Sequence, residues 1–301
     1  MTIKKYAVPA GVTSITLPDG SVLIPVGNVV STDSRYESEL VRSGCVSDDS
    51  LYLLGIPRTT FQSAIPFFLL PGDGGTNGLT FTGGGGGAFT LSAAPLTGLL
   101  SGLAGRQCYG YLPANAGGSG NAAGWYLFVP SSDTAGTFYN NTYSSSGRPA
   151  LVGSPTTFAG SPSGRITQTT NEITALSGFN MTPIGNSGEL AWKTFMASTS
   201  NANNKMYRLR LGGTATFADN GNATSGVEER LYTVRNLGDQ THQILSRQNA
   251  GVGTGLSSIS NLSSAINLSG ATTTVAITMQ LAANTDVCCL LATNLTQTYG
   301  G

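Results

Sequence analysis

Charged side chains are scarce in this sequence. Only 10% of its 301 residues are charged, and Lys plus Arg equal Asp plus Glu at 15 each. An average soluble domain carries about 25% charged residues. Because the formal net charge is zero, the chain has no field that would attract nucleic acid or an anionic membrane. We therefore expect neither of these partners.

Metal-binding and redox patterns are also missing. His242 is the only histidine, and none of the four cysteines stands in a C-x-x-C or Cys/His spacing typical of zinc sites. Cys288 and Cys289 would point to opposite faces of a strand, so we expect no disulfide between them. The sequence predicts reduced thiols, assembly in a cytoplasm and no cofactor.

Long apolar runs are absent. No stretch of 18 apolar residues occurs, so the sequence predicts no transmembrane helix. Lys4 and Lys5 are followed by no apolar segment of the kind that forms a signal peptide. We expect no membrane insertion and no secretion.

Glycine is abundant, at 41 residues, which suits tight turns better than long helices. Residues 1–56 form the first predicted unit, a hairpin followed by one helix. The hairpin joins residues 12–17 to 22–24 through an Asp-Gly turn. The helix runs from a cap at Asp33 or Ser34 to Arg42, and Gly44 is its C-cap. Its predicted apolar face contains Tyr36, Leu40 and Val41. So small a unit predicts a partner surface.

Residues 57–90 are rich in proline and glycine and predict a linker or docking arm. Its apolar patch would bind a protein surface if exposed. The patch is a candidate docking site, formed by Ile65, Phe67, Phe68, Leu69 and Leu70.

Residues 91–301 alternate strand patterns with turn signals, which predicts a mainly β domain, an antiparallel sandwich or jelly roll. Residues 206–211 alternate most clearly, with Arg208 and Arg210 on one face and Tyr207, Leu209 and Leu211 on the other. A turn at Gly212-Gly213 follows. The two arginines are candidate contacts for an anionic glycan, although a solvated or inter-subunit sheet face is the commoner role of such residues.

Several segments resemble a β-domain that recurs in tailed-bacteriophage fibre and appendage proteins. The resemblance covers roughly residues 100–301. Its segments are Trp125-Tyr126, residues 134–143, residues 154–158 and an Asn-rich hairpin, residues 199–205, leading into residues 208–214. It implies a homotrimeric, virion-attached jelly roll without a defined active site. More weakly, the N-terminal unit is similar to anchor segments of phage head proteins. This similarity implies that residues 1–56 are a virion anchor and that the apolar patch of residues 65–70 is a candidate capsid-docking site.

Catalytic patterns were weighed against this interpretation. A Ser-His-Asp triad would need His242, which follows a turn, and no G-x-S-x-G elbow is present. Six carboxylates could in principle supply a glycosidase pair, but none has a characteristic spacing. They are Asp133, Glu172, Glu189, Asp219, Glu228 and Glu229. Asp73 and Asn77 could outline a calcium loop but lack further carboxylates. Stacking of Trp125, Tyr139 or Tyr143 on a sugar is less expected than aromatic packing.

The sequence thus predicts a non-enzymatic structural protein of a phage virion. The first hypothesis is a homotrimeric head fibre, spike or capsid decoration protein that docks on capsid or tail proteins through its N-terminal region and displays its β-domain for host adhesion. The second is a receptor-binding tail fibre that grips a host surface glycan. The third is a polysaccharide-degrading spike, which the short length and the lack of a β-helix repeat disfavour.

Overall fold

The structure is a computed structural model, and it is mainly β. It describes the following residues: 3–9, 11–26, 29–47, 57–72, 78–83, 86–143, 162–181, 184–220, 227–251, 254–263, 266–268, 273–298 and 300. Its helices are short: α1 (Glu37–Arg42), α3 (Leu99–Gly102) and the 3-10 turns η1 (Ser34–Tyr36) and η2 (Ala116–Gly118). Within the described ranges, no helix has the length and apolar character needed to cross a membrane.

The N-terminal unit has its own small core. The predicted hairpin is present as β2 (Ile15–Thr16) and β3 (Val22–Leu23). The predicted helix is present as η1 and α1, and the side chain of Asp33 accepts a hydrogen bond from the Arg35 amide. Gly44 has φ +83°, and the amides of Gly44 and Cys45 donate to the carbonyls of Val41 and Leu40. These two bonds form a Schellman motif that ends the helix.

Two features of this unit differ from the prediction. The first is a three-stranded sheet, in the order β4-β1-β5, that the sequence patterns did not indicate; it consists of β1 (Ile3–Ala7), β4 (Val29–Asp33) and β5 (Val46–Ser47). The second is the helix face, because Leu40 is fully buried whereas Val41 is 51% exposed. The core gathers Tyr6, Val8, Ile15, Leu17, Val30, Leu40 and Cys45.

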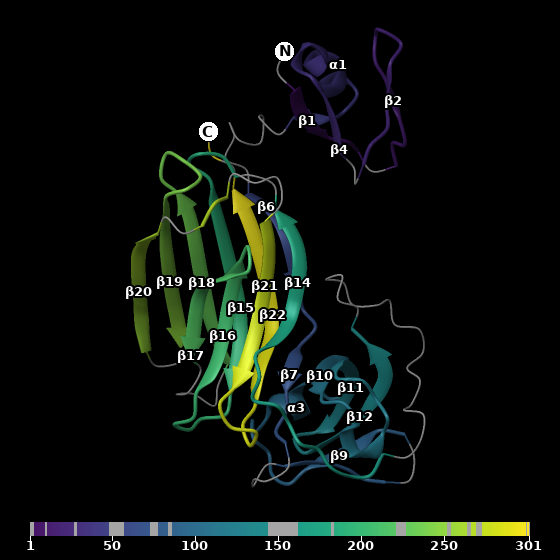
Figure 1. Cartoon of the computed structure of the whole chain (residues 1–301), viewed down its shortest axis with the longest axis vertical. Helices are drawn as coiled ribbons and strands as arrows, with labels where there is room; N and C mark the ends of the chain where they lie inside the picture. The colour runs from purple at the N-terminus through teal and green to yellow at the C-terminus, as the bar shows by residue number, and fades with distance from the viewer. Residues whose placement is uncertain are drawn as a thin grey trace.

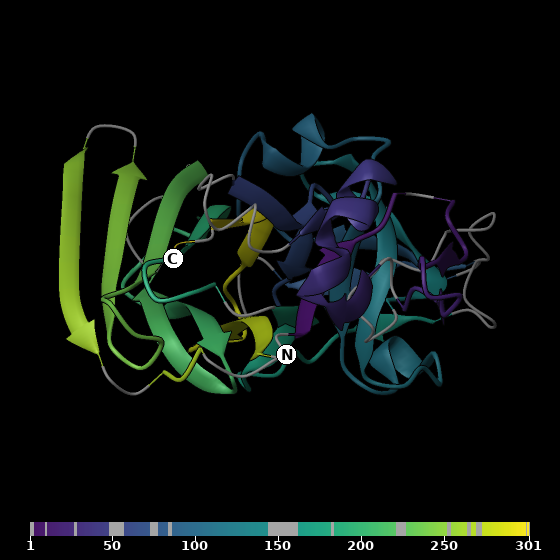
Figure 2. The ribbon, with the colours of Figure 1, turned by 90° about the horizontal axis from the view of Figure 1, so that it is seen from above.

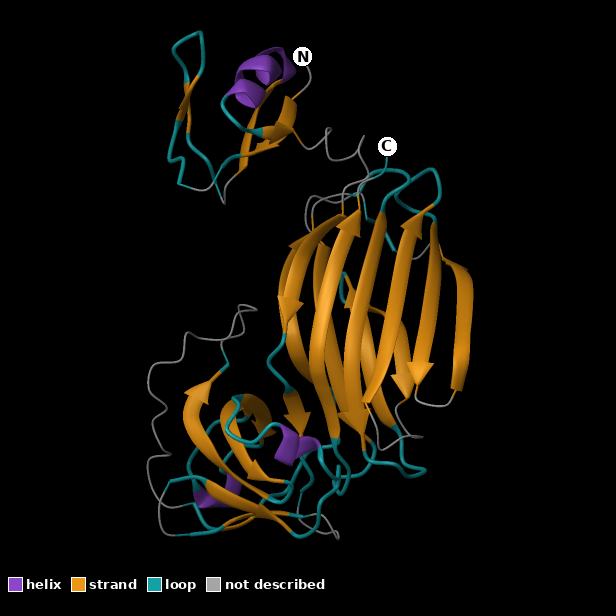
Figure 3. Ribbon diagram, turned by 180° about the vertical axis from the view of Figure 1, so that it is seen from behind, coloured by secondary structure: helices purple, strands orange, loops and turns teal. Residues whose placement is uncertain are grey.

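The rest of the chain is organised around one large sheet of thirteen strands (Figures 1 and 3). Its order is β13-β8-β9-β12-β11-β10-β7-β22-β15-β18-β19-β20, and β6 pairs with a second stretch of β22. All its pairings are antiparallel except β7 with β10. The strands are β6 (Pro57–Ser63), β7 (Phe67–Leu69), β8 (Leu79–Phe81), β9 (Ala88–Leu91), β10 (Cys108–Leu112), β11 (Gly124–Ser132), β12 (Ala135–Thr142), β13 (Gly164–Arg165), β15 (Glu189–Ser198), β18 (Val227–Asn236), β19 (Gln243–Gly251), β20 (Thr254–Ser263) and β22 (Cys288–Thr298).

A second sheet of four strands packs on part of the large sheet to form a sandwich (Figures 1 and 2). Its order is β14-β21-β16-β17, formed by β14 (Ile173–Met181), β21 (Thr273–Leu281), β16 (Lys205–Leu211) and β17 (Thr214–Asn220). The alternation predicted for residues 206–211 is confirmed: Tyr207, Leu209 and Leu211 are buried, and the arginines are not. Gly212 and Gly213 both have positive φ in the predicted turn.

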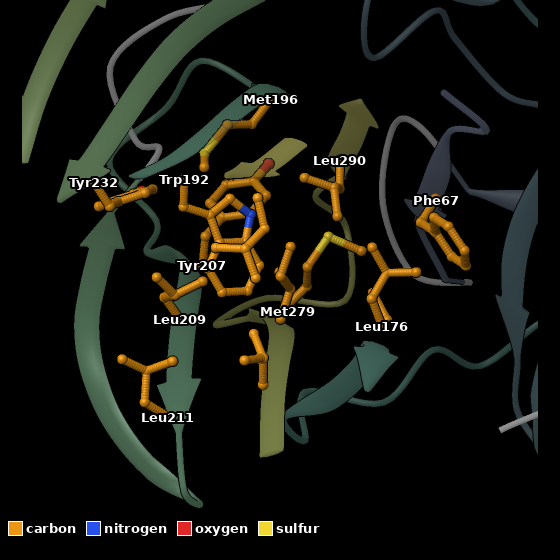
Figure 4. Close-up of a cluster of buried hydrophobic side chains, with 14 of the residues drawn as sticks. Phe67, Leu176, Trp192, Met196, Tyr207, Leu209, Leu211, Tyr232, Met279 and Leu290 are labelled. Carbon is orange, nitrogen blue, oxygen red and sulfur yellow. The ribbon is translucent and has the colours of Figure 1, made fainter. Parts of the chain in front are cut away.

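The apolar residues between the two sheets form a cluster that we call the sandwich core. Figure 4 shows Trp192, Met196 and Tyr232 of the large sheet meeting Tyr207 and Met279 of the smaller one. The mainly β class and the antiparallel sandwich expected from the sequence are therefore present.

Parts of four strands of the large sheet are buried on both faces: β7, most of β10, residues 125–128 of β11 and the start of β22 through Leu290. We call these parts the shared wall. Alternate residues of β7 serve opposite cores: Phe67 lies in the sandwich core, whereas Phe68 lies in a second cluster with Phe128 and Phe138. We call this second cluster the phenylalanine core. Cys288 and Cys289 divide in the same way, as expected for neighbours on a strand.

The shared wall overturns the linker interpretation of residues 57–90. This segment supplies β6, β7, β8 and most of β9 to the large sheet, so no linker ends at residue 90. The candidate docking patch is wrong for the same reason, because Phe67, Phe68, Leu69 and Leu70 are at most 1% exposed and Ile65 packs against the sandwich core. A strand covered on both faces reads as a continuous apolar run, which resembles an exposed patch in sequence.

Candidate functional site

The two arginines proposed as glycan contacts lie on the outer face of β16, at the solvent side of the four-stranded sheet. Their neighbours along the strand, Tyr207, Leu209 and Leu211, fix this orientation by entering the sandwich core. The side chains of Arg208 and Arg210 are 20% and 28% exposed, so each guanidinium reaches solvent from a largely covered stem.

Glu172, just before β14, joins the two arginines. Arg210 donates from Nε to Oε1 at 2.8 Å and from Nη2 to Oε2 at 3.0 Å, a bidentate pair. Nη1 of Arg208 lies 3.3 Å from Oε2 of the same carboxylate. The hydroxyl of Thr278 also donates to Oε1. One carboxylate thus holds two guanidinium groups in fixed positions.

The electrostatics of this arginine face follow from that arrangement. The hydrogen bond from Arg210 lowers the pKa of Glu172, which burial only partly opposes, and the same bond raises the pKa of Arg210. Two positive charges and one negative charge leave an excess of one positive charge. Nη1 of Arg208 also donates to Oε1 of Gln280 at 2.8 Å. The face could therefore attract one anionic group, with Arg208 as the more available donor.

Sequence reasoning assigned the two arginines but not their partners. Glu172 was considered only as a glycosidase carboxylate, yet it lies 38 residues from Arg210 in the chain. Thr278 and Gln280, on the adjacent strand β21, had no role in the prediction. No local spacing links these residues, because antiparallel pairing across the sheet brings them together.

His242 lies in the turn before β19 and pairs with Asp239, Nδ1 to Oδ2, at 2.7 Å. Asp239 also accepts hydrogen bonds from the amides of Thr241 and His242, which lower its pKa together with the histidine contact. The Thr241 hydroxyl lies 3.3 Å from Nδ1, the same nitrogen that faces Asp239. A triad needs its nucleophile on the other ring nitrogen. The geometry is that of a turn stabilised by Asp239.

Several of the six candidate carboxylates bond to structural partners. Asp133 accepts hydrogen bonds from the amides of Gly98 and Ser101, both at 2.8 Å, at the start of α3. Glu228 pairs with Arg230, and Glu229 pairs with Lys193 at 2.8 Å. Glu189 begins β15, and the Asp219 side chain lies outside the described residues. In the described part of the chain, no group of three His, Cys, Asp or Glu residues could hold a metal ion.

The other candidate residues from the sequence either pack in the core or lie outside the described residues. Trp125 is buried and donates to the carbonyl of Thr174 at 2.7 Å, while the Tyr143 ring meets Phe67 and Tyr109 edge-on. Tyr139 also packs against the sandwich core. The four cysteines are buried and unpaired with one another. Asp73 and Asn77 are outside the described residues.

The comparisons with known proteins identify no family for this chain. No protein-family model matches the chain, and no curated protein matches it. Among solved structures, it is similar to a peanut lectin determined with a nine-residue peptide. That match has 7% sequence identity and a TM-score of 0.28, and it covers 46% of this chain and 87% of the lectin chain. A score this low supports no inference about function.

Proposed function

We propose that this chain is a non-enzymatic structural protein of a tailed-bacteriophage particle, a head fibre, spike or decoration-type appendage. Its N-terminal unit would hold it on the particle, and its β-domain, with jelly-roll-like connections, would project for host adhesion. The proposal rests on the resemblance of residues 100–301 to the β-domain of phage fibre and appendage proteins.

One structural observation supports separate roles for the N-terminal unit and the β-domain. The buried cluster of the N-terminal unit is drawn from residues 6–45, whereas the sandwich and phenylalanine cores are drawn from residues 67–295. A unit with its own core can attach to a particle without rearranging the domain that it carries. Its surface also offers Ile24 and Val26, which are 73% and 83% exposed, as apolar contacts for a docking partner.

The test is a truncation that begins at β6. A chain of residues 57–301 retains every strand of the two larger sheets, so we expect it to fold and to remain soluble. It should be missing from assembled particles, whereas the full chain should be incorporated and visible on them by electron microscopy. Incorporation of the truncated chain at the level of the full chain would overturn the proposed role of the N-terminal unit.

We also propose that the β-domain is a homotrimer. Edge strands are usually protected by proline or by charged residues such as lysine. Strand β20, the last strand of the large sheet, has neither. Closed symmetry would cover such surfaces without forming open fibres. The number three comes from the resemblance. Light scattering should give about three times the chain mass of 30.8 kDa, and a stable monomer at micromolar concentration would contradict it.

A receptor-binding tail fibre is the second candidate, favoured by the arginine face. An anionic glycan could pair with Arg208, while Arg210 stays bound to Glu172. Replacing Arg208 by Gln should then weaken binding to a carboxylated polysaccharide at least tenfold, with folding unchanged. Equal binding by this variant and the unmodified protein would remove the arginine face from consideration.

A further inference from the structure

A cluster at the base of the Asn-rich hairpin combines two buried charged side chains, Lys205 and Asp286, with the exposed side chain of Asn201. Lys205 opens β16, and its side chain is 0% exposed. Its ammonium nitrogen donates to the carbonyl of Asn203 at 2.7 Å, to the carbonyl of Asn201 at 3.4 Å and to Oδ1 of Asn201. The amine of Lys205 is thus held against the carboxamide of Asn201.

Asp286, in the loop before β22, completes the cluster from a distant part of the chain. Its Oδ1 accepts a hydrogen bond from Nδ2 of Asn201 at 2.7 Å. Its Oδ2 lies 3.8 Å from Nζ of Lys205, is buried and accepts no hydrogen bond. A buried carboxylate oxygen without a hydrogen bond is costly. The carboxyl group therefore contacts both the amide that could lose its nitrogen and the amine that could replace it.

We propose that Lys205 and Asn201 become joined by an amide bond, with Asp286 as the acid–base group. A proton first passes from the ammonium of Lys205 to Asp286, leaving a neutral amine and a carboxylic acid. Nζ then attacks Cγ of Asn201 and forms the new C–N bond. The carboxylic acid of Asp286 gives its proton to Nδ2, the Cγ–Nδ2 bond breaks and one ammonia departs, and the carboxylate of Asp286 takes up the extra proton from Nζ. No oxidant, reductant or other co-reactant is needed.

The surroundings of the cluster favour this chemistry. Burial lowers the pKa of Lys205, because an ammonium group loses hydration in the interior. The charge of Asp286 opposes this shift. Tyr207, on the same buried face of β16, adds to a setting that disfavours a charged amine. Asn201 lies on the solvent side of the cluster, so ammonia has a route out.

Mass spectrometry of the purified full chain tests the proposal. The intact mass should be lower than the sequence mass by one ammonia. Trypsin should fail to cleave after Lys205, because an acylated lysine is no longer its substrate, while cleavage after Lys193 and Arg208 stays normal. The digest should contain one peptide of residues 194–208 that is also lighter by one ammonia. A full intact mass with normal cleavage after Lys205 would show a hydrogen-bonded ion pair only and overturn the proposal.

Three variants and one matched control sharpen the result. Asn201→Ala, Asp286→Asn and Lys205→Arg should each restore the full mass. Lys205→Arg keeps the buried positive charge, so it remains informative if the Asp286 variant fails to fold. Asn203→Ala changes the same loop but no reacting side chain, and it should retain the ammonia loss. A succinimide at Asn201 would lose the same mass yet leave Lys205 cleavable, which would also overturn the proposal.

Discussion

The two cores on either side of the shared wall are built from different residues. The phenylalanine core packs Phe68, Phe81, Phe89, Phe128 and Phe138 against one another, with ring centroids between 5.1 and 5.9 Å apart. Both cores contain aliphatic residues, but the sandwich core has methionines and tryptophans, which the phenylalanine core lacks. Several polar groups of the sandwich core are hydrogen-bonded, such as Nε1 of Trp192 to Oγ1 of Thr293.

Glycine explains how the phenylalanine rings fit. A Cβ added to Gly110 would lie 2.8 Å from the Phe138 ring, and one added to Gly136 would lie 2.7 Å from the Phe89 ring. Both glycines lie on strands of the large sheet, β10 and β12, so the rings occupy the space that side chains would fill. A glycine-rich segment can therefore form a dense core when large rings complement it.

The largest expected effect comes from removing one ring of the phenylalanine core. Phe128 is fully buried and contacts three other rings, so Phe128→Ala should lower the free energy of unfolding by about 3–5 kcal/mol. Urea denaturation measures this change. Phe195→Ala is the matched control, because Phe195 is partly exposed and lies outside the ring cluster, and its effect should be smaller. Equal losses of unfolding free energy in the two variants would show that the ring cluster contributes no more to stability than Phe195 does.

Adding a methyl group tests the glycine–ring complementarity directly. Gly110→Ala should cost about 1–3 kcal/mol of unfolding free energy, because the new Cβ meets the rings of Phe138 and Phe128. Gly124→Ala, on the paired strand β11, meets nothing within 4 Å and should be neutral or slightly stabilising. If the two variants had the same thermal midpoint, close packing at Gly110 would be refuted.

The sandwich core should be sensitive to loss of a hydroxyl group. The Tyr207 hydroxyl donates to the carbonyl of Ala197 at 2.7 Å and accepts from the Cys289 amide at 3.1 Å. Tyr207→Phe should therefore lower the unfolding free energy by about 1 kcal/mol. Tyr111→Phe, at a partly buried tyrosine that packs against the same core, is the comparison. A Tyr207 variant as stable as the unmodified protein would contradict the assigned bonds.

The smallest effect should come from the solvent side of the sandwich and should depend on pH. The folded pKa of Glu172 is lowered, chiefly by Arg210, so its stabilising contribution is present above the unfolded pKa of about 4.3. It is lost as pH falls through the folded pKa. Glu172→Gln should cost less than about 1 kcal/mol at neutral pH, since the pair is partly exposed. The difference should vanish in acid, and a difference that grew in acid would have the wrong sign.

The parts of the fold that could be predicted from the sequence are those in which the local residue pattern matches the burial of the residues in the structure. Strand β16 has one buried and one solvent face, so its alternation is visible. The Asp-Gly hairpin, the Asp33 cap and the Gly44 C-cap depend on residues close in sequence, and all three are present. Local signals were sufficient for each of them.

The parts that were missed depend on contacts between distant segments. Strand β7 is buried on both faces, so it shows no alternation, and the glycines around it indicated a linker. The Glu172 contact to Arg210 and the Asp286 contact to Lys205 join residues 38 and 81 positions apart. No single-sequence spacing encodes such pairs, because the strand order of the sheets creates them.

Strand β22 has a consequence for how the domain folds. It pairs with β6 and β7, the first strands of the large sheet along the chain, and with β15 on its other edge. During synthesis, β10 can pair with one edge of β7 early, but the other edge of β7 has no partner until residues 288–290 of β22 have been made. Pairing between such distant segments closes a long loop and slows folding. A ribosome-bound chain that ends before β22 should leave this edge of β7 unpaired, so the segment needs protection until β22 has been made.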